Sequence, residues 1–216
     1  MEAGGIAREP TAGQAAGARA AAPTRVLAVT SDPGPLGLAA FALTTLVLSL
    51  INANLISKAD LPVVFALALA YGGLTQLLAG MWEFRTGNTF GAVAFSSYGA
   101  FWLSFWALGQ FFLKGIPKPA QDHALAVYLI GWGIFTAYMF VASLRTTAAI
   151  SLVFILLAAT FIVLGIGNAN ASTNTIKIGG WLGIVTAGAA WYASFAAVVN
   201  STFAPRTILP VIPLRR

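Results

Sequence analysis

The sequence predicts an all-α integral membrane protein in which six transmembrane helices form one compact bundle. Its 216 residues are 58% hydrophobic and only 8% charged, with a mean hydropathy of +0.83. A soluble domain carries roughly a quarter charged residues, so this chain cannot cover a water-facing surface. The 12 Lys+Arg and 6 Asp+Glu lie almost only between apolar segments, as the charges that flank membrane spans do.

Six apolar segments are long enough to cross the hydrocarbon layer, which takes about 20 mainly apolar residues. The connections between them are short, so we expect a single bundle rather than several domains. The predicted spans are Leu36–Ile56, Leu61–Trp82, Gly91–Leu113, His123–Ser143, Ala148–Gly167 and Ile176–Asn200.

The two ends of the chain are not expected to cross the membrane. Residues 1–31 are rich in Ala, Gly, Thr and Pro, and they lack the continuous apolar core of a secretory signal. We expect them to form a disordered cytoplasmic tail. Residues 32–204 then form the six-helix transmembrane domain, and residues 205–216 form a short basic tail.

The distribution of basic residues predicts the orientation. With the N-terminus inside, eight arginines lie on the inner side of the membrane and four lysines on the outer side. Cytoplasmic loops carry the excess of basic residues, so both termini are predicted to be cytoplasmic, in a multi-pass plasma (cell inner) membrane protein. Basic residues spread this thinly also argue against a nucleic-acid partner, despite a net charge of +6.

The composition also limits the chemistry. There is no cysteine, which excludes disulfides and thiolate metal sites, and the single histidine, His123, cannot form a histidine-rich metal cluster. No carboxylate pair, Ser-His-Asp set or phosphate-binding loop can be assembled from the spans. We therefore expect no enzyme activity, no metal and no cofactor.

The first span begins with a cluster of prolines and glycines, which restrict the backbone or let it pack closely. Pro33 and Pro35 cannot extend a helix backwards, and Gly34 and Gly37 allow close approach of neighbouring backbone. A helix that starts here exposes free N–H groups and the positive end of its dipole. Two interpretations stay open, a site for a small anion and routine capping by Asp32.

A second stretch, Tyr71–Trp102, places polar residues at a span end. Glu83 is a candidate proton carrier, because an ionisable group at membrane depth is a functional candidate. The alternative is an interfacial ion pair with Arg85. Asn88 and Thr89 are expected to cap the third span, with their donors also facing the pathway.

Neutral polar side chains inside the spans predict a pathway for a small polar solute. A polar group in lipid costs free energy unless it is satisfied, so most are expected to face the bundle interior. The alternative for each Ser or Thr is a hydrogen bond back to its own helix. The polar lining residues predicted in this way are Thr44, Thr45, Gln76, Asn88, Thr89 and Asn168, and Leu36 and Gly37 are expected to line the pathway at the start of the first span.

Several motifs resemble the acetate uptake transporter family, also called succinate–acetate permeases. "DPGPLGL", which runs from Asp32 to Leu38, resembles the family's Asn-Pro-Ala-Pro-Leu-Gly-Leu signature. The resemblance continues through "YGGLTQLLAGMWEFRTGNTFGAVAFSSYGAFW", "VYLIGWGIFTAYMF", "LGIGNA" and "GGWLGIVTAGAAWY". It covers nearly everything from Asp32 to about Pro210. The signature residues here are Asp32, Pro33, Gly34, Pro35, Leu36, Gly37 and Leu38.

The resemblance implies a six-helix protein that assembles as a homo-hexamer, in which each protomer has its own pathway for acetate and related small carboxylates. It places the family's pathway constriction on Phe41, Tyr98 and Leu157. It also places Ala190 on the pathway lining, at a position associated with substrate range. The signature's leading Asn is replaced by Asp32, which acts either as a proton-linked switch together with Glu83 or as a helix cap.

The sequence thus predicts transport of acetate and related small monocarboxylates, with succinate a further candidate, by a channel or a proton-coupled permease. Acetate, membrane lipid and other copies of the chain are the expected partners. Two alternatives stay open. One is a channel for a small neutral solute such as urea or an amide, and the other is a membrane assembly or sensor protein without transport activity.

Overall fold

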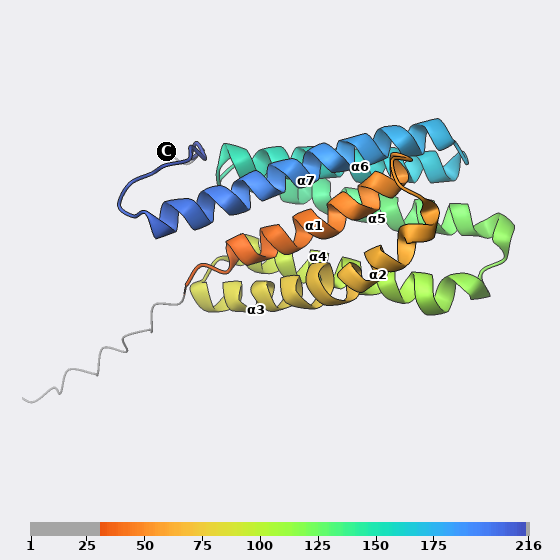
Figure 1. The fold of residues 1–216 in the computed structure, drawn as a ribbon, viewed down its shortest axis with the longest axis horizontal. Helices are drawn as coiled ribbons and strands as arrows, with labels where there is room; N and C mark the ends of the chain where they lie inside the picture. The colour runs from red at the N-terminus through yellow and green to blue at the C-terminus, as the bar shows by residue number, and fades with distance from the viewer. Residues whose placement is uncertain (1–30, 215–216) are drawn as a thin grey trace, which may run out of the picture. The chain divides into compact units, whose positions relative to one another are not determined.

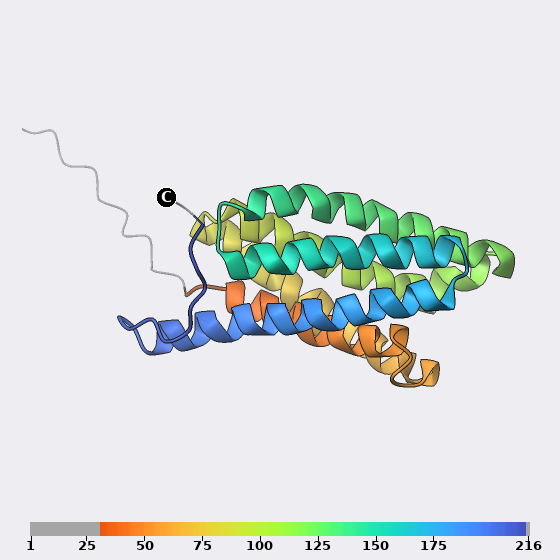
Figure 2. The same cartoon turned by 90° about the horizontal axis from the view of Figure 1, so that it is seen from above.

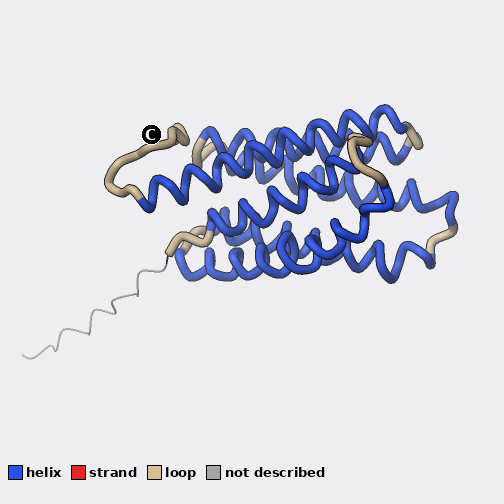
Figure 3. The backbone as a smooth tube through the Cα atoms, in the orientation of Figure 1, coloured by secondary structure: helices blue, strands red, loops and turns tan. Residues whose placement is uncertain are grey.

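The computed structural model describes residues 31–214. The expectation of a disordered tail concerns residues that lie almost entirely outside this range. The described chain is helical, with short loops between the helices (Figure 3). Its α-helices are α1 (Gly34–Asn52), α2 (Leu61–Leu69), α3 (Gln76–Thr86), α4 (Thr89–Ala107), α5 (Lys118–Ser143), α6 (Ala148–Ala169) and α7 (Thr173–Thr202).

These elements form six rods, because α2 and α3 continue one another along the second rod. The rods close a ring of neighbours (Figures 1 and 2). Helix α1 packs on α7, α7 on α6, α6 on α5, α5 on α4, α4 on the α2–α3 rod, and that rod on α1. The ring encloses the centre of the described bundle, and the large cavity lies there.

The ring has two chemically distinct ends, which separate the lysines from the described arginines. The lysine end carries Lys58, Lys114, Lys118 and Lys177, in the loops and first turns between the rods. The terminal end carries the start of α1 and the end of α7, together with Arg85, Arg145 and Arg206 (Figure 1). The basic residues therefore fall on opposite ends, as the sequence predicted.

Five helices of the described chain are long and apolar enough to cross a membrane. They correspond to α1, the continuous second rod Lys58–Thr86, α5, α6 and α7. Helix α4 has the same length as α1 but is not among the five. The protein is thus a multi-pass membrane protein, and α4 as the sixth span stays a prediction.

The second span differs from the predicted uninterrupted helix. A π-helical segment, Ala70–Thr75, joins α2 to α3. Gly72 lies in this segment, and a Cβ placed there would lie 2.8 Å from Thr44 Cβ on α1. The Thr75 hydroxyl donates to the Ala70 carbonyl oxygen at 3.0 Å and so gives this oxygen of the π-helical turn a hydrogen-bond partner. The glycine therefore lets the segment press against α1.

Other boundaries differ by a few residues. The third span ends in a π-helical segment, Leu108–Phe112, and a short 3-10 turn, Leu113–Gly115, instead of continuing as one α-helix to Leu113. The fourth span starts at Lys118 rather than His123, because Pro117 and Pro119 suit the entry to a helix. The fourth span therefore begins with polar residues that hydropathy alone assigns to the loop between the third and fourth spans.

The chain beyond α7 folds back over the terminal end. Thr146, in the loop after α5, and Ala148, the first residue of α6, hydrogen-bond to the returning segment. Ala148 N donates to Ile212 O at 2.9 Å, and Leu214 N donates to Thr146 O at 3.0 Å. The Tyr192 hydroxyl donates to Pro210 O at 2.6 Å. The described part of the predicted basic tail, residues 205–214, is therefore attached to the bundle.

We predict that Gly80→Ala destabilises the bundle, because a Cβ at Gly80 would lie 2.9 Å from Ser96 Cα where α3 crosses α4. Overpacking of this kind lowers the free energy of unfolding by about 1–3 kcal/mol. Thermal unfolding of the detergent-purified protein measures the effect. Gly115→Ala is the matched control, because a Cβ there meets nothing within 4 Å. Equal melting temperatures for the two variants would contradict the packing.

Candidate functional site

A cavity of about 370 Å³ lies inside the ring. All six rods contribute lining residues, from Phe41 on α1 to Lys177 on α7. Exposed residues at the lysine end, among them Asn54 and Lys58, form its rim. The volume is within the range of about 300–1,000 Å³ of small-molecule sites. The cavity is thus an entry from the lysine end into the centre of the protein.

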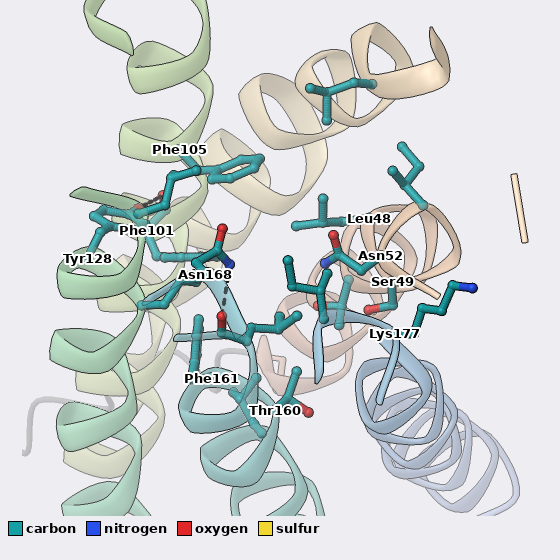
Figure 4. Close-up of a pocket in the computed structure, with 18 of the residues that line it drawn as sticks. Leu48, Ser49, Asn52, Phe101, Phe105, Tyr128, Thr160, Phe161, Asn168 and Lys177 are labelled. Carbon is teal, nitrogen blue, oxygen red and sulfur yellow. Dashed lines mark hydrogen bonds between the residues drawn. The ribbon is translucent and has the colours of Figure 1, made fainter. Parts of the chain in front are cut away.

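The wall of the cavity has a polar side and an aromatic side (Figure 4). Polar side chains on α1, α6 and α7 include Ser49, Asn52, Thr160, Asn168 and Lys177. Rings on α4, α5 and α6 form the aromatic side, and they include Phe101, Phe105, Tyr128 and Phe161. A solute with a polar head and a short apolar tail matches both sides.

On the aromatic side of the cavity, large side chains separate the backbones of α4 and α5. Helices α4 and α5 meet mainly through side chains. The Phe101 ring lies 5.7 Å from that of Tyr128 and 5.2 Å from that of Trp132. The Tyr128 hydroxyl donates to the Phe101 carbonyl at 3.0 Å and lies 2.7 Å from Ser104 Oγ. These large side chains keep the two backbones apart and leave room for the cavity.

Charged residues occur only at the rim of the cavity. Lys58 and Lys177 line it, as does one carboxylate, Asp122. None of the other lining residues is charged. Two lysines against one aspartate favour anions at the entrance, because a cleft of one predominant sign raises the local concentration of the opposite ion.

The three residues predicted to form the constriction lie together. Phe41 and Leu157 line both the large cavity and a second, apolar cavity of about 20 Å³ on the terminal side. Tyr98 lines the small cavity, and its ring lies 5.9 Å from the ring of Phe41. All three side chains are buried. They therefore come from α1, α4 and α6 to the point where the large cavity ends.

Tyr98 is held firmly in place. Its hydroxyl donates to Thr136 Oγ1 on α5 at 2.9 Å, and Thr136 donates to Trp132 O at 2.7 Å. Its ring also contacts Phe135 edge-on, with centroids 5.4 Å apart. The Tyr98 hydroxyl is thus satisfied by Thr136, and the apolar face of the Tyr98 ring lies at the constriction.

The other predicted lining residues divide into two groups. Thr45 and Asn168 line the large cavity, and Gln76 lines the small one. Gln76 is 1% exposed, and its Oε1 has no partner among the described residues. The remaining predicted residues line neither of these two cavities and stay predictions as lining residues: Leu36, Gly37, Thr44, Asn88, Thr89 and Ala190.

Their surroundings explain the second group. Thr44 donates to Ala40 O of its own helix at 2.9 Å and packs on Gly72. Gly37 lies under the Phe95 ring, and Ala190 is buried in the core. Leu36 is 47% exposed on the protein surface. Asn88 accepts from Gly91 N at 3.1 Å as the cap of α4, with Thr89 as the first residue of that helix.

The signature segment has a capping role at the start of α1. The Asp32 carboxylate accepts a hydrogen bond from Gly34 N at 2.8 Å. Pro33 accepts from Gly37 N through its carbonyl, at 3.2 Å. Ser194 on α7 donates to Pro35 O at 2.7 Å, which ties α7 to the same segment. The described structure thus accounts for the motif through helix capping and contact with α7.

Glu83 is buried at the terminal end, with 1% of its surface exposed. The Thr86 hydroxyl donates to its Oε2 at 3.1 Å, and the Asn88 side chain also hydrogen-bonds to its carboxyl group. The alternative of an ion pair with Arg85 finds no support among the described residues, because positions two apart on a helix point in different directions. Asp32 is near, since both carboxyl groups lie within 3.5 Å of the Cβ position of Gly34.

Sequence reasoning missed several residues of the cavity, including Trp102, Lys58 and Lys177. Lys58 and Lys177 were interpreted as charges between the spans, and Trp102 was noted only as the end of a motif. These residues could be found only by knowing that their helical turns face the centre of the ring. The sequence alone does not say which face of each helix points there. Residues 31–214 contain no group of His, Cys, Asp or Glu arranged to hold a metal.

A ring of apolar helices with an internal cavity defines a multi-pass membrane protein of the channel and transporter class. The chain belongs to the GPR1/FUN34/yaaH family, whose model matches residues 15–216. This confirms the resemblance to the acetate uptake transporter family that the signature motifs indicated.

Named relatives agree with this family. The chain is 43% identical over 187 residues to acetate permease A of Emericella nidulans, covering 80% of this chain and 63% of that protein, which is less than two thirds of its length. It is 36% identical over 181 residues to the succinate-acetate/proton symporter SatP of Escherichia coli K12, covering 84% and 95% of the two chains. A solved structure of the bacterial acetate channel SatP superposes with a TM-score of 0.79 at 36% identity, covering 85% of this chain and 99% of that chain.

Proposed function

We propose that the protein carries acetate and related small monocarboxylates, with succinate a further candidate, across the plasma membrane through a passage inside each protomer. The names of its relatives, an acetate permease, a succinate-acetate/proton symporter and an acetate channel, support this substrate class. The observation that carries the proposal is the internal cavity, to which every rod contributes and which ends between Phe41 and Leu157.

In this proposal Phe41, Tyr98 and Leu157 form a dry constriction that excludes larger solutes and hydrated ions. The lining beneath the rim offers hydroxyl, amide and indole groups but no charged side chain. A small carboxylate is therefore held by weak hydrogen bonds rather than by a fixed cation. Weak binding suits rapid passage, because a deep site would slow the release of the solute.

Proton coupling is assigned to the terminal end. Glu83 is the candidate, because its buried carboxyl group has the neutral partners Thr86 and Asn88 and lies close to Asp32. Two carboxyl groups in one place favour the uptake of a proton, since like charges disfavour ionisation of both. A carboxylate leaving the constriction towards this end would meet that proton.

The assembly and orientation follow the same proposal. Residues 32–204 form the transport domain, α4 is its sixth span, and six copies associate as a homo-hexamer through their apolar outer surfaces. The arginine-bearing terminal end faces the cytoplasm, because cytoplasmic loops carry the excess of basic residues. The lysine end then faces outward, so that substrate from outside meets Lys58 and Lys177 first.

Uptake of labelled acetate into liposomes that contain the purified protein tests the proposal. We expect uptake above that of empty liposomes, competed by unlabelled acetate. An imposed pH gradient and an imposed voltage, applied separately, distinguish proton-coupled movement from flux of the bare anion. Absence of acetate flux with folded protein would overturn the proposal, and flux of urea or acetamide instead would favour a channel for neutral solutes.

We predict that Phe41→Ala and Leu157→Ala widen the constriction and admit longer carboxylates such as lactate and succinate. The preference for acetate over lactate should fall roughly tenfold, since a methylene-sized difference in an apolar site is worth about that much discrimination. Competition against labelled acetate uptake measures it. Phe161→Ala is the control, because Phe161 is equally buried but lines only the large cavity. Unchanged selectivity in both test variants would remove these residues from the filter.

We also predict that the lysines at the rim attract the substrate. Replacing Lys58 and Lys177 together by Gln should lower the initial rate of acetate uptake about threefold or more at low salt, with the difference fading at high salt. Lys114 and Lys118 replaced together by Gln are the control, because they change the charge of the same end without lining the cavity. Equal losses in the two double variants would mean that only the overall charge of the surface matters.

A further inference from the structure

Tyr98 of the constriction is held by three residues on one face of α5. Trp132, Phe135 and Thr136 lie at positions i, i+3 and i+4, so their side chains are neighbours on the helix surface. The Tyr98 ring lies 5.4 Å from the ring of Phe135 and 6.2 Å from that of Trp132. Its hydroxyl lies 2.9 Å from Thr136 Oγ1. Helix α5 thus fixes a side chain that belongs to α4.

A second hydrogen bond settles which hydroxyl is the donor. A threonine hydroxyl carries a single proton, and Thr136 donates it to the Trp132 carbonyl oxygen at 2.7 Å. Tyr98 is therefore the donor and Thr136 the acceptor. Thr136 is fully buried and lines neither cavity. The proton of the Tyr98 hydroxyl thus points into the contact between α4 and α5.

The hydrogen bond lies directly behind the constriction. Phe41, Tyr98 and Leu157 come from α1, α4 and α6, whereas α5 contributes none of the three. Hydrogen bonds join α4 to α5 at two levels of the described bundle. Tyr128 makes those nearer the lysine end, and Tyr98 makes the one at the constriction. Thr136 therefore determines what the Tyr98 hydroxyl can do.

A free tyrosine donor at the constriction would change how a carboxylate passes. A carboxylate consists of acceptors alone, and hydrogen bonds to a charged group are among the stronger ones in proteins. Such a donor would retain the anion at the narrowest point of its path. Rapid conduction requires binding that is weak enough for release. Engaging the Tyr98 proton elsewhere keeps the constriction apolar.

We propose that Thr136 is a positioning residue of the transport pathway. It accepts the Tyr98 proton, fixes the ring at the constriction and withholds the donor from passing carboxylates. The inference rests on the proposed transport of small carboxylates, and it adds a residue of α5 that acts only through Tyr98.

The test compares the kinetics of labelled acetate uptake into liposomes for wild type and Thr136→Val, which keeps the side-chain shape and removes the hydroxyl. The Tyr98 proton then loses its acceptor and becomes available to the anion. KM should fall about tenfold, because a hydrogen bond to a charged group is gained. The maximal rate should fall by a similar factor, because release must break that bond. Thr136→Ser keeps an acceptor and should retain both wild-type values.

A second comparison shows whether the effect passes through the Tyr98 hydroxyl. Tyr98→Phe removes the donor, so adding Thr136→Val to it should change neither KM nor the maximal rate further. Thr186→Val is the matched control, because Thr186 is also fully buried, donates to its own helix and lies 3.2 Å from a hydroxyl on a neighbouring rod. It lines neither cavity and should keep wild-type kinetics.

Wild-type kinetics in Thr136→Val, or a lower rate with unchanged KM, would overturn the positioning role while acetate transport itself stands. An equal effect of Thr136→Val with and without the Tyr98 hydroxyl would also overturn it, because the substitution would then act through helix packing. Absence of uptake by the wild-type protein would instead remove the proposed function. Melting temperatures verify the fold, and Thr136→Ala removes the same hydroxyl if Thr136→Val does not fold.

Discussion

The arrangement of this protein depends on one constraint, which is that a polar group inside a membrane span needs a hydrogen-bond partner. The buried threonines show how the chain meets it, because four of them donate to their own helix backbone. Tyr98 is satisfied across two rods by Thr136. Four buried groups have no partner among the described residues: Thr45 and Trp102 line the large cavity, Gln76 lines the small one, and Ser96 lines neither. Three of the four unpartnered groups thus belong to residues of the cavity walls.

Helix packing decides where that solute can go. Close approach at Gly72 and Gly80 brings the second rod against α1 and α4. Large rings between α4 and α5 do the opposite and hold their backbones apart. The helices are thus packed closely around the second rod and held apart between α4 and α5. This difference leaves a cavity inside the ring while all six rods stay in place. Phe41 and Leu157 end this cavity where three rods converge.

The sequence predicted most of the architecture, because apolar segments separated by charges leave few alternatives for a chain of this composition. It missed the π-helical segment at Ala70–Thr75, since the glycines that permit it also occur in regular membrane helices. The signature motifs led to Phe41, Tyr98 and Leu157, which lie together. Thr44 and Thr45 looked equivalent in the sequence. Only the packing of α1 against Gly72 reveals that Thr44 faces a helix and Thr45 the cavity.

The central claim is that the substrate passes through the cavity of each protomer, and the natural lack of cysteine allows a direct measurement. Leu48→Cys places a thiol on the cavity wall, while Leu46→Cys, on the same helix, does not line it. Both are treated with a small thiol-reactive sulfonate, and acetate uptake is measured before and after. The account predicts that modification at position 48 blocks uptake, that acetate slows this reaction, and that modification at position 46 leaves uptake intact. Complete modification at position 48 with unchanged uptake would contradict a passage through this cavity.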